Sequence, residues 1–392
     1  MKKIIISFFI IALLLLPIQV LAIEDNTVEE IQSLDDNFDG YGEEIEYPTE
    51  FYRAQIIKVR EEPLLDEDLA GQGFPDIYQV VELEILDGKF KGEKYTIDHI
   101  NMGSAAYDIW VKEGDKVMIF AELTEGKDSI VNVYISDFVR WPHLRNLTIL
   151  FIILLIIIGK WQGVKSLIGL GVTALSIVYF LLPLMLKGYS PIILAIIVCI
   201  FSTIVTIFIV SGFILKSISA IIGTLCGVLI AGIISYGFGN IAKLTGLSAQ
   251  EAQMLMFIPQ GIEFDFKGLL FAGIIIGALG AVMDVAMSIS SAMDEIRSNN
   301  TSIATKDLVR SGLVVGRDIM GTMSNTLILA YTGSAIPLLL LFIAYETSIV
   351  NVLNLDLIAT EVVRALTGSI GLLASIPITA LMYGLLRKRE EG

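Results

Sequence analysis

The chain has 392 residues, of which 54% are hydrophobic, and its mean hydropathy of +0.73 excludes a soluble globular protein and indicates a multispan membrane protein. The net charge of −15 is uneven: residues 23–146 contain 29 Asp and Glu against 11 Lys and Arg, and residues 147–392 contain 13 against 14. A soluble region this acidic repels nucleic acid. Two cysteines and two histidines are too few for a disulfide framework or a Cys/His zinc site, so we expect no cofactor.

Residues 1–22 have the pattern of a secretory signal. Lys2 and Lys3 precede the apolar run Ile4–Leu16, and Val20-Leu21-Ala22 supplies a small-residue end. We interpret the segment as a cleaved signal peptide, with an uncleaved N-terminal anchor as the alternative. Either interpretation exports the region that follows.

Residues 23–46 contain ten acidic residues and no base, which favours a solvated acidic linker. Within them, Asp35, Asn37, Asp39 and Glu46 match the ligand spacing of an EF-hand calcium loop. The apolar residue usual at the eighth loop position is missing, and Pro48 stops the helix that would follow. A solvated tail is therefore the favoured interpretation over a calcium site.

Residues 47–140 are predicted to form a small exported β domain. Short alternating runs occur at 51–59, 77–86, 94–100, 115–123 and 129–135, with glycine-containing turns between them. Five strands in this length predict a small barrel that is OB-like or SH3-like. Because the domain is acidic, we expect a spacer or a protein-binding role and no nucleic-acid binding.

Residues 141–392 are predicted to be an all-α membrane bundle of about seven transmembrane helices. The predicted spans are 146–159, 166–186, 190–214, 217–238, 268–290, 313–343 and 357–386. Loops on the predicted inner side carry ten Lys and Arg against three on the outer side, which places the C-terminus in the cytoplasm. The segment Ser248–Lys267 is too broken to span.

Pairs of glycines four residues apart are expected to allow close helix packing. They are Gly223/Gly227, Gly273/Gly277 and Gly312/Gly316.

Two spans carry an aspartate followed by polar residues at i+4 and i+7, which draws a polar stripe along one helix face. The stripes are Asp284, Ser288 and Ser291 in the fifth span, and Asp318, Thr322 and Asn325 in the sixth. A carboxylate in lipid costs about 2.5–3.5 kcal/mol, so it suggests an ion or proton site. The alternative is a structural ion pair of Asp284 or Asp318 with Arg317.

The seventh span contains Glu361 and Arg364 at i and i+3. Their place near the predicted outer end suits an external gate. The alternative is a local ion pair.

Catalytic motifs are missing from the sequence. It contains no phosphate-binding loop, no H-E-x-x-H and no G-x-S-x-G, so we do not expect an enzyme, although a membrane-embedded enzyme stays open.

Three stretches carry a family resemblance: Gly268–Asp284, Gly316–Met323 and Asn325–Tyr331. They closely resemble the bacterial YibE/F-like membrane proteins. The resemblance implies a multipass protein of the bacterial inner or cell membrane with an exported soluble domain, and it implies no particular activity.

Two function hypotheses follow from these residues. The leading one is a secondary transporter or permease for a small solute or ion, with its site between the fifth, sixth and seventh spans. The alternative is a non-transporting scaffold or sensor in the lipid bilayer, whose acidic external domain binds a protein partner. Seven spans do not divide into two equal repeats, so the usual inverted-repeat scheme is not supported.

Overall fold

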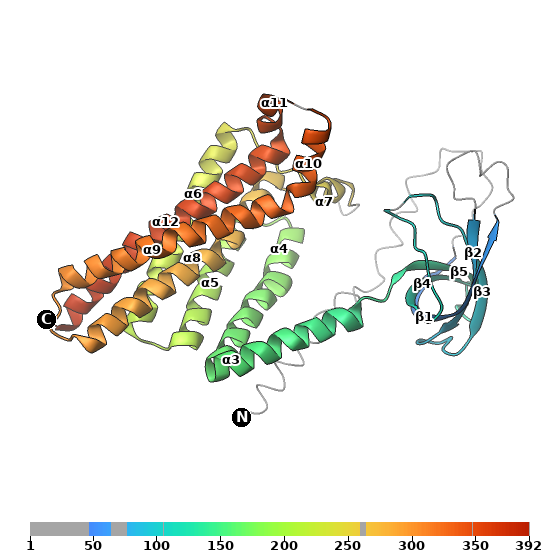
Figure 1. The fold of residues 1–392 in the computed structure, drawn as a ribbon, viewed down its shortest axis with the longest axis horizontal. Helices are drawn as coiled ribbons and strands as arrows, with labels where there is room; N and C mark the ends of the chain where they lie inside the picture. Colours follow the sequence, from blue (N-terminus) through green and yellow to red (C-terminus); the bar gives the residue numbers. More distant parts are fainter. Residues whose placement is uncertain (1–46, 64–76, 105, 259–263, 347, 392) are drawn as a thin grey trace. The chain divides into compact units, whose positions relative to one another are not determined.

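The computed structural model describes residues 47–63, 77–104, 106–258, 264–346 and 348–391. The chain divides near Phe151 into two compact units, a β domain and a helical part (Figure 1). The predicted signal segment, the acidic linker and the calcium-loop pattern lie outside the described residues.

The β domain is a single antiparallel sheet. Its strands are β1 (Thr49–Pro63), β2 (Ile77–Ile85), β3 (Lys94–His99), β4 (Lys116–Leu123) and β5 (Ile130–Phe138). The order across the sheet is β3-β2-β1-β4-β5, and the long β1 pairs with both β2 and β4 through a bulge at Ile56 and Lys58. The predicted five strands are thus confirmed, and they curve into a half-barrel (Figure 1).

Alternation along the strands explains the core of this domain. Val81, Leu83 and Ile85 on β2 are fully buried, whereas Glu82 and Glu84 between them point to the wetter face. The same alternation on β1 and β4 gives the half-barrel its own hydrophobic core, separate from that of the helices.

The remaining described chain is helical. Its elements are α3 (Trp141–Ser176), η2 (Ile177–Leu181), α4 (Leu182–Leu186), α5 (Pro191–Ser211), α6 (Leu215–Ile241), α7 (Gln250–Met254), η3 (Leu255–Phe257), α8 (Phe266–Asn299), α9 (Thr305–Ser334), α10 (Ile336–Ala344), α11 (Ile349–Leu353) and α12 (Asp356–Glu391). Only the short α7 and η3 occupy the predicted broken segment before α8, so that prediction is confirmed for its described residues.

The predicted count of seven spans is not confirmed. Within the described ranges, five apolar stretches are long enough to cross a membrane, or six if α9 and α10 count as one span. The first two predicted spans fall on one stretch, Trp141–Leu186, which is interrupted at Lys160 (φ 47°, ψ −128°). The sixth falls on α9 and α10, which meet at a 58° bend. The count therefore depends on how two breaks are treated: the one at Lys160 lies at the predicted end of the first span, and the bend between α9 and α10 was not predicted.

Glycines bring the central helices α6, α8, α9 and α12 close together. A Cβ placed on Gly227 of α6 would lie 2.7 Å from the carbonyl oxygen of Gly371 on α12. A Cβ on Gly312 of α9 would lie 2.5 Å from the sulfur of Met293 on α8. Two of the predicted glycine pairs therefore sit at helix contacts. The third pair does so at one residue only: Gly273 has no atom near its Cβ position, whereas a Cβ on Gly277 would lie 3.1 Å from the Tyr331 hydroxyl of α9.

Candidate functional site: an open polar face on α8 and α9

Both predicted polar stripes lie on the outside of the helical part. Asp284 and Ser288 are exposed side chains of α8, and Ser291 on the same helix is half-buried. Asp318, Thr322 and Asn325 are exposed side chains of α9. We call Asp284, Ser288, Asp318, Thr322 and Asn325 the α8–α9 polar face.

The two stripes lie at the same depth, because α8 and α9 are antiparallel neighbours. A Cβ on Gly316 would lie 3.3 Å from the Ile289 side chain, which fixes the register of the two helices. Six residues further along α9, Thr322 therefore lies level with Asp284. By the same register, Asp318 lies level with Ser288.

No ion pair joins the two stripes within the described residues. Arg317 forms no salt bridge with Asp284 or Asp318, and neither carboxylate accepts a hydrogen bond within the described chain. Arg317 is exposed and lies about 100° around the helix axis from Asp318. The described residues also hold no cluster of three His, Cys, Asp or Glu side chains placed to bind a metal ion.

Asp294, ten residues after Asp284 on α8, differs from Asp284 in that its carboxylate has partners on other helices. Its Oδ1 accepts a hydrogen bond of 2.9 Å from the Tyr383 hydroxyl of α12, and its Oδ2 lies 3.4 Å from Nζ of Lys216 on α6. This cluster ties three helices together at one end. The predicted fifth span ends at residue 290, before Asp294, and the partners of Asp294 lie far away along the chain, so the sequence did not indicate this cluster.

The Asp294 cluster also gives a measure of depth. A Lys, an Asp and a Tyr side chain from three helices meet there, as expected at a membrane boundary. At 1.5 Å rise per residue, Asp284 lies about 15 Å further along α8. That distance is about half of a 30 Å hydrocarbon layer. Asp284 therefore lies deeper in the membrane than its position near the end of the predicted span 268–290 suggests.

Glu361 and Arg364 form the predicted pair on α12. Arg364 Nη1 donates to Glu361 Oε1 at 2.8 Å, and the guanidinium lies 6.0 Å from the ring centre of Tyr331 on α9. The other carboxylate oxygen, Oε2, is buried without a partner. The local pair is therefore present, with one oxygen left over.

Glu361 lines a cavity of about 230 Å³ at the bend between α9 and α10, together with Tyr331, Thr332 and Leu339. It is separate from the polar face. Gly368 lies against Ala278, so Glu361 is level with residue 271 of α8, about 20 Å from Asp284.

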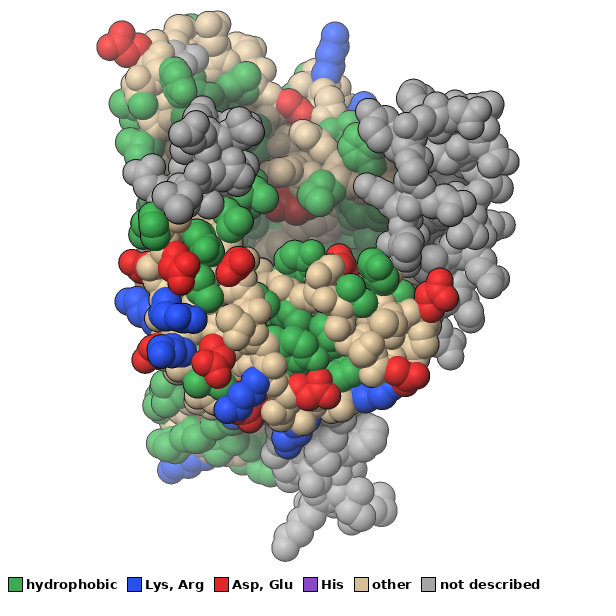
Figure 2. Space-filling model, turned by 90° about the vertical axis from the view of Figure 1, so that its right-hand side faces the viewer, with side chains coloured by type: hydrophobic (Ala, Val, Ile, Leu, Met, Phe, Trp, Pro, Cys, Tyr) green, Lys and Arg blue, Asp and Glu red, His purple; other side chains and the backbone are tan. Residues whose placement is uncertain are grey.

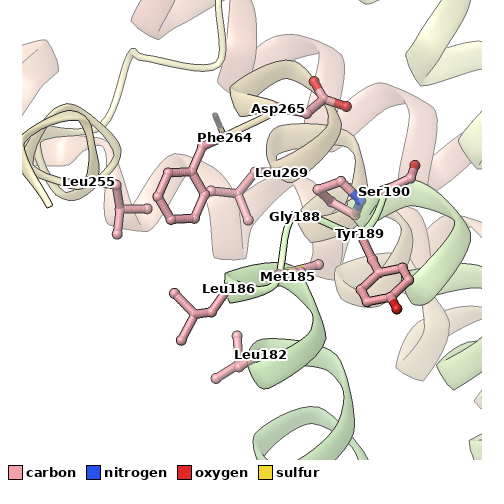
Figure 3. A pocket seen from close by; sticks show the side chains of 11 residues that line it. Leu182, Met185, Leu186, Gly188, Tyr189, Ser190, Leu255, Phe264, Asp265 and Leu269 are labelled. Carbon is pink, nitrogen blue, oxygen red and sulfur yellow. The ribbon is translucent and has the colours of Figure 1, made fainter. Parts of the chain in front are cut away.

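A second cavity of about 260 Å³ lies between the ends of α4 and α8. Figure 3 shows Leu182, Leu186, Leu255 and Leu269 around it, with Asp265 at its edge. The Asp265 carboxylate accepts a hydrogen bond from Gly268 N and so caps α8. The cavity is mainly apolar, and its one carboxylate is the capping Asp265.

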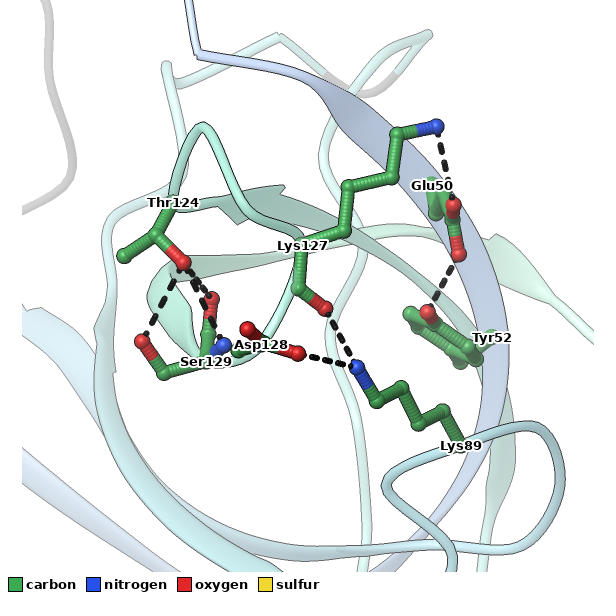
Figure 4. Close-up of polar contacts among 7 residues, drawn as sticks. All are labelled: Glu50, Tyr52, Lys89, Thr124, Lys127, Asp128 and Ser129. Carbon is green, nitrogen blue, oxygen red and sulfur yellow. Dashed lines mark hydrogen bonds and ion pairs between the residues drawn. The ribbon is translucent and has the colours of Figure 1, made fainter.

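The β domain has polar contacts of its own. The Tyr52 hydroxyl donates to Glu50 at 2.5 Å, and Lys127 Nζ lies 3.4 Å from the same carboxylate (Figure 4). The hydrogen bond from Tyr52 holds the pKa of Glu50 below its ordinary value. Burial, and then the bond to Glu50, raises the pKa of Tyr52 to about 12.

Charge on the surface is mixed, and one aromatic patch stands out. Acidic and basic side chains are interspersed on the face shown in Figure 2. On the outer side of the sheet, Phe51, Phe120 and Tyr134 from β1, β4 and β5 form a ladder with ring centres 5.4 and 6.4 Å apart. Phe51 and Tyr134 are more than half exposed.

The apolar helices and the half-barrel define a membrane protein with an appended β domain. Residues 147–389 match the model of the YibE/F-like proteins, and residues 50–138 match that of the YibE/F family N-terminal domain. The chain therefore belongs to the YibE/F-like family. No curated protein and no solved structure matches it.

Proposed function

We propose that the chain is a permease of the cell membrane in which the α8–α9 polar face carries a proton or a small cation. The observation that supports this most is Asp284, a carboxylate without a partner about 15 Å from the charged boundary of the helices. A charge at that depth is retained at a cost, and proton relays and ion paths are its common use.

Neighbouring groups suit the same role. Asp318 provides a second carboxylate, and Asn325 and Ser288 provide oxygen ligands at nearby depths. The Thr322 hydroxyl donates to the Ile319 carbonyl, so its oxygen stays free to accept. Oxygen ligands of this kind suit a hard cation or a transferred proton.

The broken helix supports the proposal independently. Discontinuous spans in transporters put unwound backbone beside the transported ion. Here the α9–α10 bend lies beside Glu361, whose buried Oε2 has no partner. We propose that Glu361 and Arg364 form a gate at this end, about 20 Å from Asp284.

A flux assay tests the permease. Purified protein is placed in liposomes that contain the pH-sensitive dye pyranine, with a parallel set containing a sodium-sensitive dye. Asp284→Asn is expected to reduce flux to that of empty liposomes. Asp307→Asn is the matched control, since this exposed carboxylate lies on the first turn of α9 away from the polar face.

Two outcomes of the flux assay would contradict the proposal. If wild-type protein moves neither ion, or if a folded Asp284→Asn protein moves it as fast as wild type, the proposal is wrong. Size-exclusion profiles of the variants confirm folding.

The scaffold alternative rests on the aromatic ladder of Phe51, Phe120 and Tyr134. Exposed aromatic side chains are enriched where proteins bind one another. A photo-crosslinking amino acid at Tyr134 in the full chain should then give a discrete adduct in cells. The same residue at Lys91, on the turn before β3, is the control, and equal labelling at both positions would count against a binding face.

The proposed orientation has the β domain outside the cell and the C-terminus in the cytoplasm. The excess of Lys and Arg in the predicted inner loops supports it. A cysteine at Lys91 should react with a membrane-impermeant thiol reagent in intact cells, and protection until lysis would reverse the orientation.

A further inference from the structure

On α8, the α8–α9 polar face is followed toward the N-terminus by a row of exposed glycines. Toward the N-terminus from Asp284, the exposed positions are Gly280, Gly277 and Gly273. A Cβ on Gly273 or Gly280 would meet no atom within 4 Å, and one on Gly277 would lie 3.1 Å from the Tyr331 hydroxyl of α9. The open side of α8 therefore has glycines along one half and polar side chains along the other.

Contact with lipid would leave the polar groups on this side of α8 and α9 without hydrogen bonds. Hydrocarbon offers no hydrogen bond to Asp284, Asp318 or Asn325, none of which has a partner in the described chain. Exposed glycines, in contrast, let another helix backbone approach closely. The side has the composition of a helix interface without its second partner.

We propose that a second copy of this chain covers the face, and that the two copies complete one site between them. A two-fold axis along the membrane normal keeps each residue at its own depth. Arg317 and Asp318 are adjacent in sequence and both exposed without an ion pair. Arg317 of one copy therefore meets Asp318 of the other at the same depth, which a single copy does not achieve.

The role of this interface in transport rests on the proposed function, but its existence does not. Each copy supplies the face that the other lacks, so Asp284 is shielded from lipid on assembly. The test below reads assembly alone, and can therefore fail or succeed independently of the flux assay.

Disulfide crosslinking tests the contact in membranes. In a chain with Cys199 and Cys226 replaced by alanine, Gly280→Cys should form a covalent dimer on mild oxidation. Leu229→Cys is the control. It is exposed on α6 and lies level with Gly280, because Gly227 contacts Val282.

Four further variants make the outcome decisive. Gly280→Leu meets open space within the chain, so it should leave the fold intact and shift the mass in lipid nanodiscs from dimer to monomer. Gly237→Leu, at an open glycine of α6, should remain dimeric. Arg317→Asp should also weaken the dimer, and adding Asp318→Arg should restore it.

The proposal is overturned by a wild-type protein that is monomeric in nanodiscs. Equal crosslinking at positions 280 and 229, or an adduct of Gly280→Cys with a different protein, would also overturn it.

Discussion

At the scale of single residues, the informative contrast is between Asp284 and Asp294 on one helix. Asp294 forms an ion pair with Lys216 and accepts a hydrogen bond from Tyr383, so we assign it a structural role. Asp284 has no partner in the described chain, so its desolvation is offset by nothing within it. An unpaired carboxylate is harder to explain by stability than a paired one.

The structural role assigned to Asp294 predicts a stability loss. Tyr383→Phe removes one hydrogen bond to a carboxylate and should lower the free energy of unfolding by about 1–2 kcal/mol. Chemical unfolding in detergent measures it. Tyr345→Phe, at an exposed tyrosine, should change nothing, and equal losses would remove the assignment.

Tyr52 predicts a pH dependence in the β domain. Its pKa is raised to about 12, so the folded state favours the protonated phenol. The stability it contributes is complete below the ordinary pKa of about 10 and is lost as the pH rises through 12. The difference in absorbance at 295 nm between wild type and Tyr52→Phe should titrate near pH 12, and a midpoint near 10 would contradict the buried bond to Glu50.

At the scale of elements, glycine decides which helices touch. Gly227→Val places a methyl-bearing carbon against the Gly371 carbonyl and should lower stability by about 1–3 kcal/mol through overpacking. Gly237→Val on the same helix meets open space and has the same change in helix propensity. Thermal unfolding of the two variants should differ, and equal melting temperatures would contradict the packing.

Local pattern predicted the elements well where one period dominates. The alternation of Val81, Leu83 and Ile85 with glutamates located β2, and the long apolar runs located α5, α6, α8 and α12. The first predicted span ends at residue 159, beside the turn at Lys160, but hydropathy does not report a bend inside an apolar run, so the bend after Ser334 was missed. The count of seven spans is not confirmed, because it depends on how these two breaks are counted.

At the scale of the whole molecule, pattern could place Asp284 and Asp318 on stripes but not say which way the stripes face. That depends on which helices contact α8 and α9, and those contacts join residues far apart in sequence, such as Gly316 with Ile376. The structure leaves the polar stripes on the outside and separates them from Glu361. The predicted single site between three spans is therefore two polar places at different depths.

The central claim is that the α8–α9 polar face carries a proton or a small cation, which requires that water reach it, between paired copies as well as in a single copy. Thr322→Cys, in the chain lacking Cys199 and Cys226, lies level with Asp284 and should react with a membrane-impermeant thiol reagent in sealed vesicles. Leu229→Cys, on the apolar outside of α6, should not react, because a thiol in hydrocarbon does not ionise. Rapid labelling of Thr322→Cys alone is the predicted result, and a Thr322→Cys protein as unreactive as Leu229→Cys would contradict the account.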